Sequence, residues 1–203
     1  MSSFRFSRIF SIRTIIKKLK CRKAAGPDEI PVEILKEMTE ANLEAVNDLL
    51  TKWWNQENIE EEELRARVVL IYRRRDTNKF ENYRPISLLN SVYKIYAAAF
   101  QARLAEAIDD DLQGTQFGFR KSRSTSAPIN SVKCIVERAY ASQNPAYLVF
   151  LDWEKAFDKV DQEKLLEAMT RLGLPEKMIK VLASFYVNPQ FRVKDREGKS
   201  GYR

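Results

Sequence analysis

Histidine is absent from this chain of 203 residues, and cysteine occurs only twice, as Cys21 and Cys134. The two cysteines lie far apart in the sequence and form no C-x-x-C pair. Zinc centres of cysteine and histidine, histidine general bases and Cys–His nucleophiles all need residues that this composition does not supply. The sequence therefore excludes these three kinds of chemistry, and it is compatible with reduced thiols.

Long apolar runs are missing as well: no stretch reaches the length of a membrane span, and no secretory signal is evident. We therefore expect an intracellular protein of the cytoplasm or nucleus. The first twenty residues, MSSFRFSRIFSIRTIIKKLK, are rich in Arg and Ser and free of acid, which is also typical of a mitochondrial transit peptide. Mitochondrial targeting stays open as an alternative to an accidental start in a shortened reading frame.

Acidic residues are scarce only at the N-terminus. The net charge is +7, yet residues 1–23 hold eight Lys and Arg and no acid, which leaves 27 basic and 28 acidic side chains in the other 180 residues. Elsewhere the basic residues gather locally, at 73–75 with Arg84 and at 120–123. This pattern favours a cleft for an anionic substrate over a uniformly cationic surface.

The most informative segment is YLVFLDWEKAFDKVD, from Tyr147 to Asp161. Its aromatic and β-branched run indicates a buried strand that ends at Asp152, and open α/β sheets place their chemistry at such strand ends. Mg²⁺ keeps several waters and is bound through one or two protein oxygens, so Asp152 is suited to be a metal ligand. The alternative is a core strand with an acidic tip. Asp158 is interpreted as a charge at the start of the following helix.

Cations suited to a triphosphate follow the apolar run VVLIY, as Arg73, Arg74 and Arg75. Side chains alternate along a strand, so at least one guanidinium projects to each face and bidentate phosphate contact becomes feasible. Arg84 precedes Pro85, which favours an extended backbone at Arg84 and removes one donor from the strand ladder. A solvated turn between two strands is the alternative for at least one of the consecutive arginines.

Residues 116–125, QFGFRKSRST, combine aromatic with basic side chains. This combination is suited to stack nucleobases and to follow a phosphate backbone. In the alternative interpretation, Gly118 merely turns the chain and the phenylalanines anchor it to the core. The residues that we expect to contact nucleic acid are Gln116, Gly118, Phe119, Arg120, Lys121 and Arg123.

Helical scaffold separates these segments. Apolar residues at helical spacing predict core faces over 43–54 and 132–139, and a helix over 92–108 with Asp109–Asp111 at its solvated end. Two more helices follow Asp161, separated by Gly173 and Pro175. The two core faces are formed by Leu43, Val46, Leu50, Trp53 and Trp54, and by Val132, Ile135, Val136 and Ala139.

Five segments occur in one order, which is more specific than any of them alone: KAAGPDEIPVEILK, VVLIYRRRD, NYRPISLLNSVYKI, QFGFRKSRST and LDWEKAFDKVD. Together they resemble the fingers and upper palm of the reverse transcriptase of non-LTR (LINE-type) retrotransposons, from about Ile12 to the end of the chain. The resemblance implies an α+β right-hand polymerase fold and RNA-directed DNA polymerase chemistry. It implies a basic N-terminal segment and fingers over 1–146, and a partial palm over 147–203 whose antiparallel sheet is incomplete, with no thumb.

The resemblance also assigns the catalytic residues. The aspartate at the position of Asp152 coordinates both catalytic Mg²⁺ ions in that family. The aromatic at the position of Phe157 lies under the deoxyribose and excludes a 2′-hydroxyl; ordinary core packing is the alternative here. The implied substrates and partners are deoxynucleoside triphosphates, an RNA template and a DNA primer, with no membrane and no evident protein partner.

Triphosphate and template contacts follow from the same resemblance. Basic residues of the family hairpin hold the triphosphate, which implies this role for Arg84 and for Arg73 or Arg74. Relatives often have Pro-Lys where this chain has Tyr72-Arg73, so the arginine that makes the contact stays open. Residues 116–123 fall in the region that the family uses near the template, with Ser122 where glycine is common.

The family's second metal-binding pair, an Asp-Asp hairpin after a Gln-Gly loop, does not occur after Asp158. With one carboxylate, and at most one weak Mg²⁺ site, we expect no polymerase activity from these residues alone.

The last segment, FRVKDREGKSGYR, predicts a hairpin from Phe191 to Tyr202. Without further palm strands, the apolar faces of residues 147–151 would be open to water and favour aggregation. Two alternatives to a reverse transcriptase fragment stay open: a nucleic-acid-binding remnant without catalysis, and an inert pseudogene product.

Overall fold

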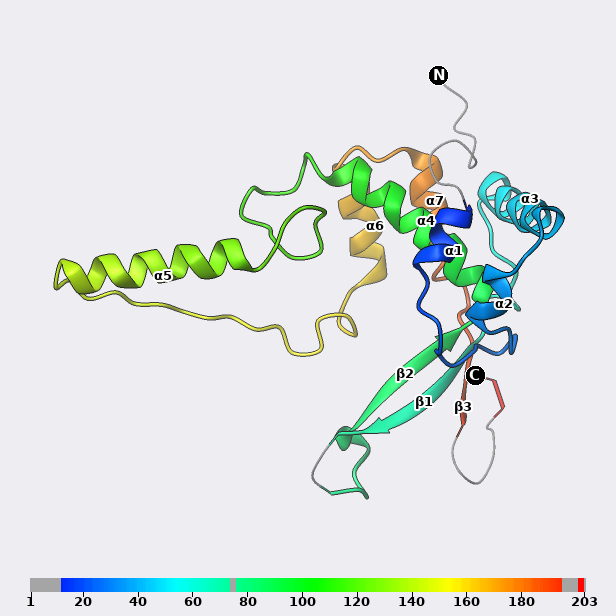
Figure 1. Cartoon of the computed structure of the whole chain (residues 1–203), viewed down its shortest axis with the longest axis horizontal. Helices are drawn as coiled ribbons and strands as arrows, with labels where there is room; N and C mark the ends of the chain where they lie inside the picture. Colours follow the sequence, from blue (N-terminus) through cyan, green and yellow to red (C-terminus); the bar gives the residue numbers. More distant parts are fainter. Residues whose placement is uncertain (1–11, 74–75, 195–200, 203) are drawn as a thin grey trace. The chain divides into compact units, whose positions relative to one another are not determined.

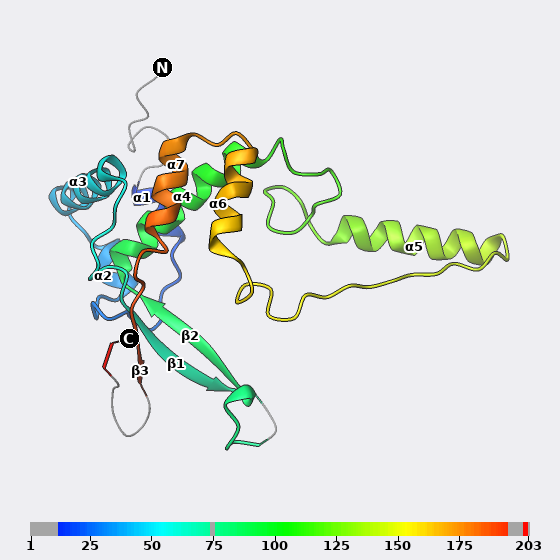
Figure 2. The same cartoon turned by 180° about the vertical axis from the view of Figure 1, so that it is seen from behind.

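A computed structural model describes residues 12–73, 76–194 and 201–202. The chain divides into two compact units, one made of Met1–Arg103 with Pro175–Arg203 and the other of Leu104–Leu174. Figures 1 and 2 show their elements from opposite sides. The expected boundary between fingers and palm, at residues 146 and 147, concerns polymerase subdomains rather than compact units, and it stays a prediction.

Helices form the core of the first unit. The predicted apolar face over 43–54 is confirmed for Val46, Leu50, Trp53 and Trp54, which are buried, whereas Leu43 is half-buried. Trp53 meets Tyr96 edge to face, with ring centroids 5.4 Å apart. Such aromatic pairs stabilise a core beyond the area that they bury. The helices of this unit are α1 (Ile12–Lys18), α2 (Val32–Lys36), α3 (Glu40–Gln56), α7 (Glu176–Ser184) and α4 (Ser91–Ile108) as far as Arg103.

A three-stranded sheet of order β2-β1-β3 completes the first unit. β1 (Ala66–Tyr72) pairs antiparallel with β2 (Tyr83–Leu89) and parallel with β3 (Phe191–Lys194). β3 lies beside Ala66–Val69 only, so the outer part of the β1–β2 hairpin is two-stranded and projects away from the helices of this unit (Figure 1). The mixture of helices and strands confirms the predicted α+β class.

The C-terminal hairpin that the sequence predicts is found only in its first strand. β3 is that strand, and its parallel pairing with β1 is not predicted, because alternation indicates a strand and not its neighbour. Most of the expected return strand, including Ser200, lies outside the described residues, and Gly201 and Tyr202 have no strand structure.

The second unit contains the end of α4, then α5 (Ser126–Ala141) and α6 (Gln162–Arg171). The predicted helix over 92–108 is confirmed, and it ends directly before Asp109. α5 contains the predicted helix over 132–139, but it has no buried residue, so the predicted core face is wrong. No described helix is both long and apolar enough to cross a membrane.

The start of α6 corrects one prediction. Asp161, not Asp158, caps this helix, because its side chain accepts a hydrogen bond from the Lys164 N–H at 3.1 Å. Asp158 lies in an exposed turn that precedes the helix. Beyond α6, Gly173 adopts a left-handed backbone with φ +74°, as a helix-ending glycine does, and Pro175 precedes α7.

Tyr147–Leu151 is not a buried strand in this structure, so that prediction is wrong. Its side chains are 43–88% exposed, and its backbone makes no hydrogen bond with any described residue. A strand needs a neighbour that pairs its N–H and C=O groups, and the described part of the chain provides none here. The segment runs back beside α5 as an extended chain (Figures 1 and 2), and the expected exposure of its apolar faces is confirmed.

Candidate nucleotide-binding site

A polar junction fixes the base of the β1–β2 hairpin. Asp28 Oδ2 accepts a hydrogen bond from the Ser91 N–H at 2.5 Å, and Asn90 Oδ1 accepts one from the Asp28 N–H at 3.0 Å. Asn90 Nδ2 donates to Glu62 O and Glu63 Oε2, each at 3.1 Å. A carboxylate at the start of α4 satisfies an unpaired N–H and suits the positive end of the helix dipole. The junction therefore ties the loop around Asp28 to the end of β2.

Close backbone packing reinforces this junction. A Cβ on Gly26 would lie 2.2 Å from Leu89 O, so the loop passes directly over the end of β2. From β1, Arg67 Nη2 donates to Ala25 O at 3.0 Å and also to Gly26 O. The charge and apolar patterns of the sequence predict no role for these positioning residues. A Gly-Pro-Asp turn, and an asparagine directly before a helix, are the signals that point to them.

Arg73 and Arg84 lie on the same face of the hairpin. Arg84 is opposite Ile71 in the register, and the Arg73 N–H donates to Asn82 O at 2.9 Å, which continues the ladder one step beyond β1. Opposite residues share a face and faces alternate along a strand, so the two arginines are diagonal neighbours, roughly 7–8 Å apart. Both are exposed, and no described residue pairs with either guanidinium. The hairpin thus presents two available guanidinium groups on one surface.

Local contacts hold the turn that carries these arginines. Tyr72 and Tyr83 pack on the opposite face, with ring centroids 5.5 Å apart. The Tyr83 hydroxyl donates to Thr77 O at 2.9 Å, and Asn82 Nδ2 donates to the backbone carbonyl of Asp76 at 2.6 Å. Arg74 and Arg75 lie outside the described residues, so their predicted roles stay predictions.

Arg120 holds a turn instead of presenting its guanidinium to solvent. Nε donates to Asp109 Oδ1 at 2.8 Å, Nη2 to Asp109 O at 2.7 Å and Nη1 to Gln113 O at 3.0 Å. The hydrogen bond raises the pKa of Arg120 and lowers the pKa of Asp109. Asp109, the first residue of the predicted solvated helix end, is therefore ion-paired with Arg120. A contact between Arg120 and nucleic acid would compete with this ion pair.

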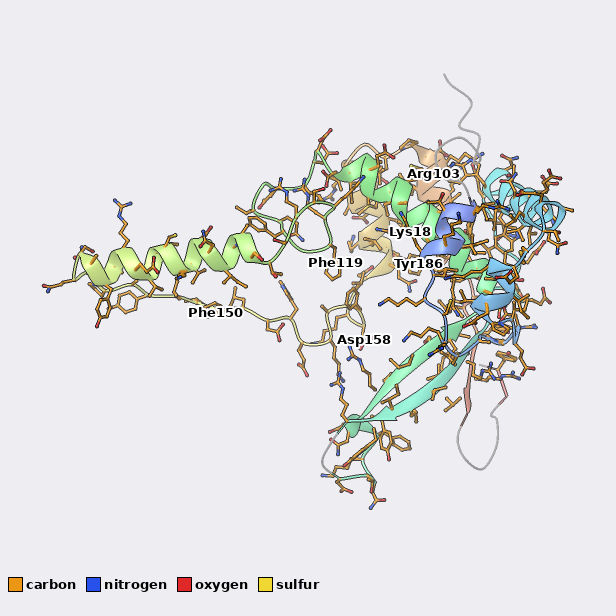
Figure 3. All side chains as sticks on the ribbon, viewed as in Figure 1. Lys18, Arg103, Phe119, Phe150, Asp158 and Tyr186 are labelled. Carbon is orange, nitrogen blue, oxygen red and sulfur yellow. The ribbon has the colours of Figure 1, made fainter. Side chains whose placement is uncertain are left out.

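The rest of the predicted template segment is exposed. Phe119 is 96% exposed and has a left-handed backbone with φ 61°, so it does not anchor the chain to a core. Gly118 has no such backbone, and a Cβ there would meet only Gln116 Nε2 at 3.9 Å. Gly118 lies in a turn, so this part of the alternative is confirmed, and Ser122 has a left-handed backbone with φ 59°. Lys121 and Arg123 are exposed, as is Phe119, which is labelled in Figure 3. The Arg123 guanidinium lies 5.9 Å from the centre of the Phe117 ring and donates to Gly114 O at 3.4 Å.

Asp152 and Phe157 lie in the exposed stretch between Phe150 and Asp158, which Figure 3 labels. Phe157 is 84% exposed, so the core-packing alternative is wrong. Asp152 makes no hydrogen bond or ion pair with a described residue. In the part of the chain that the structure describes, no three His, Cys, Asp or Glu gather closely enough to hold a metal. Because Mg²⁺ needs only one or two protein oxygens, the unpaired Asp152 fits as one ligand.

The predicted site residues are thus distributed over the two units. Arg73 and Arg84 come together on the hairpin of the first unit. Asp152, Phe157 and the residues from Gln116 to Arg123 belong to the second unit. The structure therefore brings Arg73 and Arg84 together on one face and leaves the carboxylate of Asp152 without a partner among the described residues.

Residues 75–203 match the sequence pattern of a family described as reverse transcriptase (RNA-dependent DNA polymerase). The chain is 31% identical over 122 residues to a probable RNA-directed DNA polymerase from transposon BS of Drosophila melanogaster, which covers 59% of this chain and 13% of that protein. It is 26% identical over 185 residues to the RNA-directed DNA polymerase from mobile element jockey of the same species, which covers 90% of this chain and 20% of that protein.

A third relative comes from a vertebrate. The uncharacterized 149 kDa protein of transposon TX1 of Xenopus laevis is 26% identical over 130 residues, which covers 64% of this chain and 10% of that protein. The chain therefore spans between 10% and 20% of the length of these three relatives.

Proposed function

Because this chain belongs to the reverse transcriptase (RNA-dependent DNA polymerase) family, we propose that its hairpin binds the triphosphate of a deoxynucleotide through Arg73 and Arg84. The family match covers residues 75–203, and two relatives are named as RNA-directed DNA polymerases of mobile elements. The observation that carries the proposal is the shared, exposed face of the two arginines. Guanidinium groups bind phosphate oxygens bidentately, and two diagonal groups reach different phosphates of one ligand.

Titration of the protein with dATP and Mg²⁺ tests this proposal. Arg73→Ala and Arg84→Ala should each weaken binding about tenfold or more, because a hydrogen bond to a charged group contributes about 1.5–3 kcal/mol. Arg171→Ala is the matched control: it removes the same charge from an arginine of α6 whose side chain is 82% exposed. Equal weakening of dATP binding by all three substitutions would mean that the loss of one positive charge explains the effect, and it would contradict the proposal.

Asp152 is, in the same proposal, a ligand of Mg²⁺. A bound Mg²⁺ would supply Lewis-acid stabilisation of the phosphoryl oxygens. Support comes from the exposed and unpaired carboxylate directly after the apolar segment. Mn²⁺ binding followed by electron paramagnetic resonance should weaken in Asp152→Asn and remain unchanged in Asp158→Asn, which removes a carboxylate of the same exposed stretch. Equal binding by wild type and Asp152→Asn would contradict this role.

The 203-residue polypeptide by itself is proposed not to extend a primer. Its sequence after Asp158 contains no Asp-Asp pair, and catalysis with two metals in line needs further carboxylates beside Asp152. Primer extension on an RNA template with Mg²⁺ and deoxynucleotides checks this expectation. Nucleotide incorporation that Asp152→Asn abolishes would contradict it.

Template RNA is proposed to contact the exposed residues Phe119, Lys121 and Arg123. One exposed aromatic ring and two exposed cations within five consecutive residues suit base stacking and phosphate contact. Filter binding over a salt series should show weaker RNA binding in Phe119→Ala and a smaller salt dependence in Lys121→Ala. RNA binding without any binding of dATP would favour the second candidate function, a nucleic-acid-binding protein without catalysis. Loss of RNA affinity at moderate salt would exclude both.

A further inference from the structure

Each arginine of the nucleotide-binding hairpin directly follows a tyrosine, and the two tyrosines are paired. Tyr72 precedes Arg73, Tyr83 precedes Arg84, and the register places Tyr72 opposite Tyr83. Their ring centroids lie 5.5 Å apart, with the ring planes at 59° to each other. Side chains alternate along a strand, so the rings lie on one face of the hairpin and the arginines on the other. The ring pair therefore holds together the backbone from which the two guanidinium groups project.

A second contact of Tyr83 reaches the turn of the hairpin. Its hydroxyl donates to Thr77 O at 2.9 Å, and thereby ties the residue before Arg84 to the chain that follows Arg73. β3 lies beside Ala66–Val69 only, so this outer part of the hairpin is two-stranded. A two-stranded hairpin is marginally stable in water, so a hydrogen bond across its turn changes how well its end is ordered.

The order of this turn matters for a ligand that needs both arginines at once. Groups that are already held at the right separation bind more tightly, because less freedom is lost on binding. A triphosphate has phosphates for both guanidinium groups, whereas a monophosphate has one and depends less on their separation. We propose that the Tyr83 hydroxyl is a positioning group that holds Arg73 and Arg84 at the separation for a triphosphate, without touching the ligand. This inference rests on the proposed nucleotide-binding function and adds to it a residue that determines specificity.

Titration of Tyr83→Phe with dATP and with dAMP, each with Mg²⁺, tests the inference. The substitution removes the hydroxyl and keeps the ring against Tyr72. The preference for dATP over dAMP should fall about two- to tenfold, as for the loss of one hydrogen bond, while the affinity for dAMP stays that of wild type. Tyr140→Phe is the matched control: it removes a hydroxyl from an 87% exposed tyrosine of α5 and should keep the full preference. An unchanged preference in Tyr83→Phe would overturn the inference.

A second comparison shows whether Tyr83 acts through the arginines. In a chain that carries both Arg73→Ala and Arg84→Ala, Tyr83→Phe should cause no further loss of dATP binding, because no guanidinium group remains to be positioned. A further loss in this background would mean that the hydroxyl contacts the ligand itself, and it would overturn the positioning role. Failure of the proposed function looks different: wild type would then show no preference for dATP that the arginine substitutions remove. A preference that depends on the arginines but not on the Tyr83 hydroxyl would overturn this inference alone.

Discussion

Asp28 accepts a hydrogen bond from the backbone N–H of Ser91 at 2.5 Å, and so joins positions that are 63 residues apart. The bond connects the loop after α1 to the start of α4 and thereby fixes the base of the arginine-bearing hairpin. We expect Asp28→Ala to lower the free energy of unfolding by about 1–3 kcal/mol, because it leaves helix N–H groups unpaired. Urea unfolding measures this change, and a midpoint equal to that of wild type would contradict the role of the junction.

Gly26 packs against the backbone of Leu89 so closely that no side chain fits. Gly26→Ala places a Cβ 2.2 Å from Leu89 O, and we expect it to destabilise the protein by about 2 kcal/mol or more, because backbone must move. Gly114→Ala is the matched control, since a Cβ there meets nothing within 4 Å. The difference between the two midpoints of thermal unfolding checks the prediction. Equal midpoints would show that the loop does not pass over β2 as closely as described.

Ser122 has a left-handed backbone with φ 59°, which glycine adopts without steric cost. We expect Ser122→Gly to stabilise the protein by about 0.5–1 kcal/mol. Ser124→Gly, a neighbouring exposed serine whose φ is not positive, should be neutral or slightly destabilising. Opposite signs for the two serines in urea unfolding support the described backbone, and a stabilising Ser124→Gly would contradict it.

Glu63 is half-buried beside Asn90, and burial raises the pKa of its carboxyl above the usual 4.5. The folded protein therefore holds this proton more tightly than the unfolded chain does. The resulting stability is present below pH 4.5 and is lost as the pH rises through the folded pKa. Glu63→Gln keeps an acceptor for Asn90 Nδ2 without a charge, so its stability relative to wild type should increase from pH 4 to pH 7. Urea unfolding at several pH values measures this, and a relative stability independent of pH would contradict it.

Periodicity in the sequence predicts most of the regular elements but not their neighbours. The apolar face of α3 and the extent of α4 follow from residues spaced along one helix. β3 pairs in parallel with Ala66–Val69, and nothing in its alternation distinguishes that partner from another. Tyr147–Leu151 fails as a predicted strand for the same reason: its residues favour a strand, but the described chain brings no neighbour to its backbone.

Residue type predicts the chemistry of the site but not the geometry. The arginines after VVLIY indicate an anion site, yet only the register places Arg73 on the face of Arg84. Arg120 has the same charge, but it binds Asp109 and the carbonyls of the turn after α4, a role that charge patterning does not distinguish from nucleic-acid contact. The left-handed backbone of Ser122 likewise cannot be predicted from the types of side chain in the sequence.

The shared face of Arg73 and Arg84 is tested most directly by comparing dATP with dAMP in the presence of Mg²⁺, for wild type, both single alanine variants and the double variant. If the two guanidinium groups hold one triphosphate, wild type should bind dATP at least about tenfold more tightly than dAMP. Each single substitution should remove most of that preference, and the double variant should lose little more, because the two residues act on one ligand. A double variant that still prefers dATP as strongly as wild type would contradict the account.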